Sequence, residues 1–103
     1  MTQTAELTAV HTIGGNLGQT VSISGNVIVA GAWNLGGSSG YEGAAFLYVR
    51  PVGGWSTTSS FAERLTIIDT YEYGWSVGIS GSSVVVGSIG NNGETGAAYV
   101  YGP

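Results

Sequence analysis

The sequence predicts an all-β fold made of two copies of one strand unit, and three observations carry this prediction. The 103-residue chain contains 19 glycines but only two prolines. It is also rich in Val, Ser, Thr and Tyr, which are common in strands and turns. From Gly74 to Ser88, two short apolar segments flank Gly81-Ser82, a pair typical of a hairpin with a type II′ turn. Residues 18–32 repeat this pattern at a displacement of 56 residues, so the unit occurs twice.

Alternation of apolar and small residues with period two marks the strands along the chain. In the first repeat, two β-branched runs flank Gly25-Asn26 and predict a second hairpin. A third strand ends before Pro51, which cannot donate a hydrogen bond to a ladder. We expect no helix. The expected strands are residues 4–10, 19–24, 27–32, 44–50, 61–68, 75–80, 84–88 and 97–101.

Two further matches indicate that one of the two units is permuted. Residues 43–48 and 96–101 share the pattern Gly-Ala-Ala-aromatic-aliphatic-Tyr, which aligns the third strands. Residues 5–8 resemble residues 62–66 with one insertion, which aligns the first strand of the chain with the fourth strand of a unit. We expect one domain over residues 1–103, divided into a closing outer strand, a complete unit and a unit without its outer strand at residues 3–10, 18–68 and 73–103.

These motifs resemble the FG-GAP type of β-propeller repeat, in its calcium-free variant. Residues 73–81 carry an aromatic-Gly step and Ser-Val-x-Ile-Ser-Gly, and residues 84–101 carry Val-Val-Val-Gly and Gly-Ala-Ala-Tyr-Val-Tyr. The first repeat departs from this pattern at Leu17-Gly18, and Trp33 and Ile89 stand where the family usually has proline. The resemblance implies two four-stranded antiparallel blades of a β-propeller, one per repeat. It also implies a secreted or cell-surface location, although the first residues show no signal-peptide pattern.

The loop that binds calcium in other members of this family is missing from both repeats. In the calcium-binding branch an Asp-rich loop precedes the Val-Gly-Ala strand, whereas this chain has only the turns Gly25-Asn26 and Gly81-Ser82 at that place. Calcium takes at least six oxygen ligands, and these turns carry no carboxylate. The oxygen-rich residues 91–94 are interpreted as an Asn-Gly turn in a solvated loop. Because the chain also has no cysteine, we expect neither a metal site nor a cofactor.

Two blades are too few for a closed propeller, which typically has about four to eight. The strand at residues 3–10 offers a solution, because it can add to the edge strand 97–101 of a neighbouring copy by β-augmentation. We therefore expect completion by homo-oligomerisation, with a trimer of six blades favoured over a tetramer of eight. The alternative is a two-sheet sandwich monomer, and a fragment of a longer propeller would assemble in the same way. The residues expected at the closure are Ala5, Leu7, Ala9, Ala97, Tyr99 and Tyr101.

Charge and residue types exclude several classes of function. The formal net charge is −4 and the chain has no lysine, which argues against a nucleic-acid partner because such partners need a basic surface. No segment approaches the roughly 20 apolar residues of a membrane span, so we expect no membrane partner. His11 is the only histidine and has no cysteine or lysine partner, and turn chemistry explains the carboxylates of Asp69 and Glu72. We therefore expect no catalytic residues and no enzyme activity.

The loops that follow the second and fourth strands of a blade open at one end, where this chain gathers aromatic, amide and carboxylate side chains. This combination suits a saccharide, because an aromatic ring can stack on the apolar face of a sugar while polar groups bind its hydroxyls. Trp33 and Tyr71 would be the stacking platforms, while Trp55 opens at the opposite end. A glycan ligand, a protein ligand bound in adhesion, and a scaffold without a dedicated ligand are the three hypotheses. The expected ligand-binding residues are Trp33, Asn34, Tyr41, Asp69, Tyr71 and Glu72.

Overall fold

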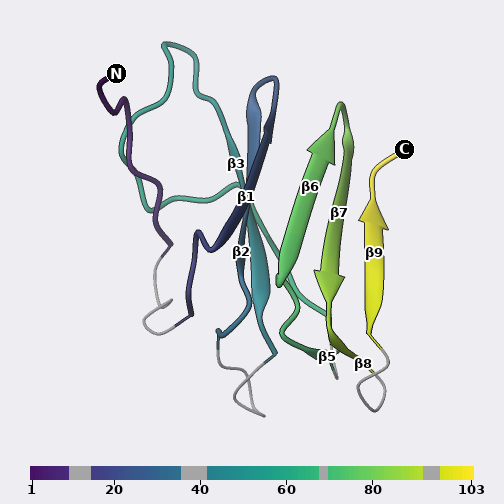
Figure 1. The fold of residues 1–103 in the computed structure, drawn as a ribbon. Helices are drawn as coiled ribbons and strands as arrows, with labels where there is room; N and C mark the ends of the chain where they lie inside the picture. Colours follow the sequence, from purple (N-terminus) through teal and green to yellow (C-terminus); the bar gives the residue numbers. More distant parts are fainter. Residues whose placement is uncertain (10–14, 36–41, 68–69, 92–95) are drawn as a thin grey trace.

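Two antiparallel sheets lie face to face in the computed structural model of the chain (Figure 1). The structure describes residues 1–9, 15–35, 42–67, 70–91 and 96–103. One sheet has four strands in the order β1-β2-β3-β4, the other has three in the order β6-β7-β9, and β5 and β8 form a short ribbon. The described residues contain no helix, and therefore none that could cross a bilayer. The all-β prediction is confirmed.

The four-stranded sheet comes from the first repeat. Its strands follow one another in space as they do in sequence, so each is joined to the next by a simple antiparallel connection. The turn between the first two strands has φ of 57° at Gly25 and a negative φ at Asn26, as a type II′ turn requires. The fourth strand is shorter than the expected range of 61–68. The strands are β1 (Thr20–Ser24), β2 (Val27–Ala32), β3 (Ala44–Val49) and β4 (Glu63–Leu65).

The three-stranded sheet comes from the second repeat and consists of β6 (Ser76–Ser80), β7 (Ser83–Ser88) and β9 (Ala97–Tyr101). Gly81 in its hairpin turn has φ of 58°, which matches the expected type II′ turn. In the described part of the chain no strand pairs with the outer edge of β9. The second sheet thus lacks the fourth strand that the first sheet has.

The ribbon of β5 (Thr70–Tyr71) and β8 (Gly90–Asn91) was not expected, because both stretches read as loops. Its register pairs Thr70 with Asn91 and Tyr71 with Gly90. Two-residue strands show no alternation in sequence, so only their spatial proximity reveals them.

Of the strand expected at residues 4–10, the described residues 4–9 form no ladder within the chain. Val10 lies outside the described residues, and pairing with a neighbouring copy stays a prediction. Leu7 forms one isolated parallel bridge with Thr58, and the Thr8 N–H donates to the Thr58 carbonyl at 2.9 Å. The Thr58 N–H donates in turn to the Glu6 carbonyl at 3.0 Å. Because β4 already holds the outer position of the first sheet, this N-terminal segment lies against the face of that sheet instead.

The core is divided into two clusters by the first sheet. The inter-sheet cluster, between the two sheets, is built on the buried residues Val29, Ala45, Leu65, Tyr73, Val84 and Val86. The outer-face cluster, on the opposite side of the first sheet, is built on Ala9, Ala30, Ala32, Leu35, Ala44, Phe46 and Tyr48. Strand alternation explains this division, since successive residues of β2 point to opposite faces.

The internal repeat is also visible in the backbone. Positions that correspond between the repeats adopt the same left-handed conformations, including one position where asparagine in the first repeat is replaced by glutamate in the second. Such φ values are uncommon outside glycine, so their recurrence indicates one fold used twice. The pairs are Asn16 (59°) and Glu72 (57°), Gly18 (94°) and Gly74 (92°), and Gly43 (79°) and Gly96 (81°).

Candidate functional site

The short ribbon of β5 and β8 lies at one end of the sheets, together with the described residues that follow β2 and precede β6, at the bottom of Figure 1. The two hairpin turns lie at the other end. We call the end with β5 and β8 the loop end, and the ligand-binding role of its residues stays a prediction. Trp33, Asn34 and Glu72 are described here, and Tyr71 is placed only by its backbone in β5. Tyr41, Asp69 and His11 lie outside the described residues.

An aromatic pair at the loop end joins the two repeats. The rings of Trp33, which follows β2, and Trp75, which precedes β6, have centroids 4.9 Å apart and an interplanar angle of 68°. The Trp33 indole N–H donates to the Gln19 side-chain oxygen at 2.5 Å, which fixes the orientation of this ring. Trp75 is 40% exposed. Trp75 was not among the expected ligand-binding residues, because its place in the sequence indicates only the start of a strand.

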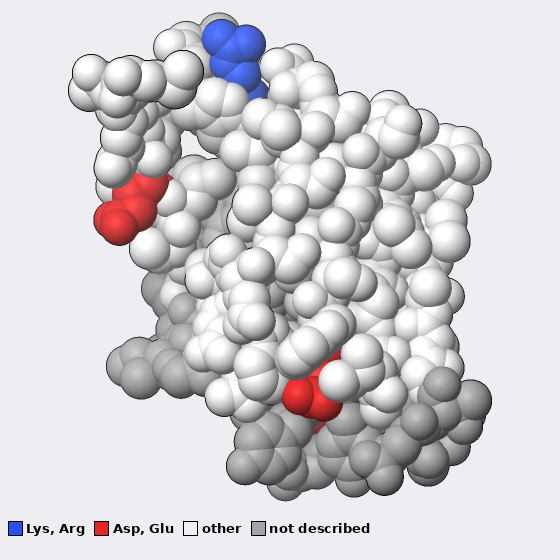
Figure 2. Space-filling view, viewed as in Figure 1, with Lys and Arg blue, Asp and Glu red and all other residues white. Residues whose placement is uncertain are grey.

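Carboxylate and amide groups belong to the same short segments. The Tyr73 N–H donates to the Glu42 carbonyl at 3.0 Å, and the Trp75 N–H donates to the Glu72 carbonyl at 3.0 Å. The backbones of both glutamates are therefore tied to the segment that carries Trp75. Figure 2 shows acidic side chains at this lower end of the molecule. Among the described residues no group of three His, Cys, Asp or Glu could hold a metal ion.

Two tyrosine hydroxyls meet inside the inter-sheet cluster. The side chain of Tyr73 is fully buried, and its hydroxyl forms a hydrogen bond with that of Tyr101. Burial raises the pKa of Tyr73 above its usual value, and the hydrogen bond to Tyr101 raises it further. Burial likewise raises the pKa of Tyr48, whose hydroxyl donates to the Thr8 carbonyl at 2.9 Å. The hydroxyls of Tyr73 and Tyr48 therefore stay protonated at neutral pH, and both side chains belong to the packed core.

Replacing Tyr73 with phenylalanine should make the free energy of unfolding fall less steeply as the pH rises above about 10. The unfolded chain releases the Tyr73 proton from about pH 10 upward, whereas the folded chain retains it. Tyr73 therefore leaves the free energy of unfolding unchanged below about pH 10 and lowers it as the pH rises further. The variant also loses a hydrogen bond worth about 1 kcal/mol at neutral pH. Denaturant titrations at neutral and alkaline pH measure both effects, and an unchanged alkaline slope would contradict the assignment.

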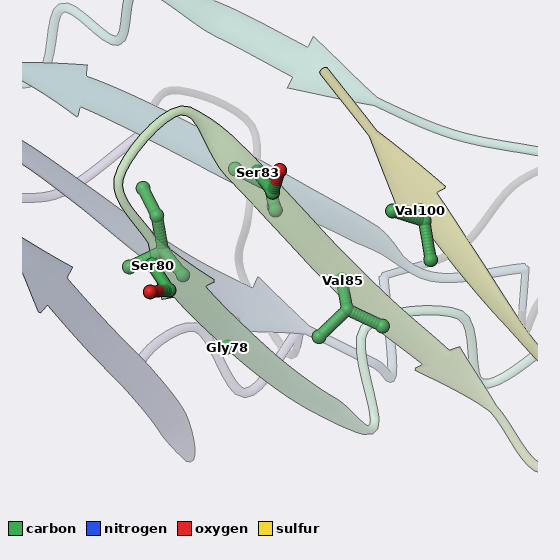
Figure 3. A pocket seen from close by; sticks show the side chains of 7 residues that line it. Gly78, Ser80, Ser83, Val85 and Val100 are labelled. Atoms are coloured by element: carbon green, nitrogen blue, oxygen red, sulfur yellow. The ribbon is translucent and has the colours of Figure 1, made fainter. Parts of the chain in front are cut away.

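Each sheet also presents an apolar face that the chain leaves uncovered. On the outer face of the second sheet, Val85 and Val100 are 39% and 72% exposed. Figure 3 shows both side chains beside a shallow hollow of about 250 Å³. No charged side chain appears over β6, β7 and β9 in Figure 2, and these strands contain none. On the outer face of the first sheet, Val21 and Ile23 are 61% and 60% exposed.

The two repeats place their outer segments in corresponding positions. Leu65 and Ile67, in and after β4, contribute to the inter-sheet cluster. Leu7 and Ala9 of the N-terminal segment pack in the same way on the outer-face cluster. By the sequence match, Leu7 corresponds to Leu65 and Ala9 to Ile67. Residues that match in sequence thus pack on the two opposite faces of the first sheet.

Comparison with known proteins identifies the second of the two repeats. The FG-GAP repeat family matches residues 69–101, about a third of the chain. This match covers the segment 73–101, on which the sequence resemblance chiefly rested, and confirms it. No curated protein and no solved structure gives a significant match.

Proposed function

We propose that this chain, whose residues 69–101 are an FG-GAP repeat, is a two-blade unit of a β-propeller that closes into a ring of identical copies. The ring acts as a non-catalytic scaffold or binding module. Three chains would give six blades, and four chains would give eight. The observation that carries the proposal is that each uncovered face is the repeat counterpart of a face that is buried within the chain.

The apolar faces correspond residue by residue. Val85 and Val100 on the exposed face of the second sheet correspond to Val29, which is fully buried between the sheets, and to Leu47, which packs beside it. Val21 and Ile23, which are exposed on the first sheet, correspond to Val77 and Ile79, which pack against the inter-sheet cluster. In the ring, one neighbouring copy would cover the face of the second sheet and the other neighbour would cover the face of the first sheet, and each would repeat an interface that the chain already contains. Such a head-to-tail interface must either close into a ring or continue as a fibre.

The hydrogen bonds between the two sheets also have repeat counterparts at the uncovered faces. Within the chain, the Gly81 N–H donates to the Ser24 hydroxyl at 3.0 Å, and the Val77 N–H donates to the Thr20 hydroxyl at 3.3 Å. The counterpart of Ser24 in the second repeat is the exposed Ser80. In the ring, Ser80 would accept the same hydrogen bond from the Gly25 N–H of the next copy.

The close approach of the backbone at Gly74 to the first sheet is a third feature that has a counterpart in the other repeat. A Cβ atom added to Gly74 would lie 2.3 Å from the Ala44 carbonyl oxygen of the first sheet. Gly18, its counterpart, has nearly the same φ, but among the described residues no atom lies within 4 Å of such a Cβ. In the ring, the backbone of a neighbouring copy would approach Gly18 as Ala44 approaches Gly74.

The N-terminal segment would complete the blade of the neighbouring copy. By correspondence with β4, Leu7 would pair with Ala98 of β9 and Ala5 with Val100. This pairing would cover the open edge of β9, which is otherwise a site for uncontrolled association. Of the expected closure residues, Ala97, Tyr99 and Tyr101 point toward the first sheet of their own chain, so they would contribute through their backbone groups.

Light scattering behind a sizing column tests the proposal directly. We expect a mass three times that of the chain, or four times for the eight-bladed ring, that persists on dilution. A folded species with the mass of one chain would contradict the ring and support the two-sheet monomer.

Binding at the loop end is the second component of the proposal, and the aromatic pair of half-buried Trp33 and exposed Trp75 supports it. The hydroxyls of Tyr73 and Tyr48, whose pKa values are raised, are buried and hydrogen-bonded. A hydrolase activity that His11→Ala abolished would contradict the non-catalytic assignment.

A further inference from the structure

We propose that Trp33 and Trp75 form a saccharide-binding site that occurs once per chain, at the junction between the two blades of that chain. The site lies within one chain and does not need the ring. The number of sites per ring, however, rests on the proposed assembly. A ring of six blades would have three sites, and every second junction between blades would lack one.

The geometry of the pair is that of a prepared binding surface. The indole of Trp33 is fixed by its hydrogen bond to Gln19, and the edge-to-face contact with Trp75 limits the movement of the second ring. Trp75 nevertheless keeps 40% of its surface exposed. Rigid aromatic side chains that present an apolar face to solvent are typical anchors for a ligand, because little conformational entropy is lost on binding.

The surrounding groups favour a neutral polyhydroxylated ligand. The apolar C–H face of a pyranose can stack on the exposed indole, and its hydroxyls can donate to carboxylates and exchange hydrogen bonds with amides. Glu42, Glu72 and Asn34 are partly exposed and belong to segments that reach the pair. An organic cation could also use indole faces beside carboxylates, and the experiment below separates the two.

Comparison of the repeats shows why the site occurs once per chain. The residue that corresponds to Trp33 in the second repeat is Ile89, and the residue that corresponds to Trp75 in the first repeat is Gln19. A junction between two chains would therefore bring together Ile89 of one chain and Gln19 of the next, and the pair of facing indoles would not form there. The backbone is repeated, whereas this pair of side chains is present at the internal junction only.

The same comparison supplies matched variants. Trp33→Ile and Trp75→Gln each introduce the residue that the other repeat carries at the same place, and circular dichroism verifies that both variants fold. Trp55→Phe removes an indole from the opposite end of the sheets and serves as the control.

The experiment is a titration of the full chain with glucose, galactose, mannose, fucose, N-acetylglucosamine and choline, followed by calorimetry and tryptophan fluorescence. We expect at least one of the sugars to bind with one site per chain, and Trp75→Gln and Trp33→Ile to weaken it about tenfold or more, the loss expected for one stacked ring. Trp55→Phe should bind as the unsubstituted chain does. Binding of choline alone, binding of none of the six probes, or sugar binding that both variants retain would overturn the proposal.

Light scattering on the same samples separates this proposal from the ring. Loss of sugar binding by variants that keep the ring mass supports the site. Sugar binding with one site per chain in a monomeric protein would support the site and contradict the ring. Two sites per chain in an intact ring would contradict the alternation of occupied and empty junctions.

Discussion

Gly87→Ala should yield a folded chain that no longer assembles into a ring. Within the chain, the three nearest atoms to a Cβ on Gly87 all belong to Ser76, and the one close contact, 2.6 Å to the side-chain oxygen, is relieved when the serine side chain rotates away. At the corresponding position in the first repeat, a Cβ atom on Gly31 would lie 2.1 Å from the Gly74 carbonyl oxygen of the facing sheet. In the ring, Gly18 of the next copy would stand in place of Gly74. Alanine would therefore hold two copies apart while leaving each copy intact.

The matched variant is Gly31→Ala, which places the same methyl group at the junction inside the chain. It should separate the two sheets and destabilise the chain itself, whereas Gly87→Ala should lower only the oligomer mass. Circular dichroism reports the fold, and light scattering reports the assembly. A Gly87→Ala protein that kept its ring mass would contradict the proposed interface.

The hairpins and the number of strands per repeat were predictable because their determinants are local. Gly25 and Gly81 each start a two-residue turn, and β-branched runs on either side alternate with period two. A second sheet of three strands, as the described residues show it, was also predictable, because the segment that matches residues 62–66 of the complete unit stands at residues 5–8 and not after residue 101.

The contacts that depend on three-dimensional proximity were not predictable. The strand expected at residues 4–10 has apolar alternation, but a strand forms only beside a free edge, and its own chain offers residue 58 instead. Trp75 was missed for a related reason, since its distance from Trp33 follows from the packing of two sheets. A comparison of the repeats at positions 33 and 75 could have found the pair, because both positions change from an aromatic residue to a non-aromatic one.

The uncovered apolar faces explain how so short a chain can have positive mean hydropathy, at +0.24. Two sheets bury one interface, yet the alternation of β1, β7 and β9 supplies apolar residues for two more faces. Soluble monomers rarely leave such faces exposed, so they mark sites of association. The N-terminal segment already lies on one of them.

Deleting residues 1–10 should abolish the ring and leave monomer or aggregate. The deletion removes the strand proposed for the open edge of β9 and also removes Leu7 and Ala9 from the outer-face cluster. Leu7→Asp should have a similar effect, because it would bury an unpaired charge between two copies. Thr2→Asp adds the same charge at an exposed position of the segment and serves as the control, so it should keep the ring.

A synthetic peptide of residues 1–10 makes the test independent of the stability of the shortened chain. If the segment acts as a donated strand, adding the peptide to the shortened protein should restore the ring mass, since backbone hydrogen bonds to β9 need no covalent link to the rest of the chain. The same peptide with Leu7→Asp should not restore it. A shortened protein that forms the ring without peptide would show that the interface closes by its sheet faces alone and would contradict strand exchange.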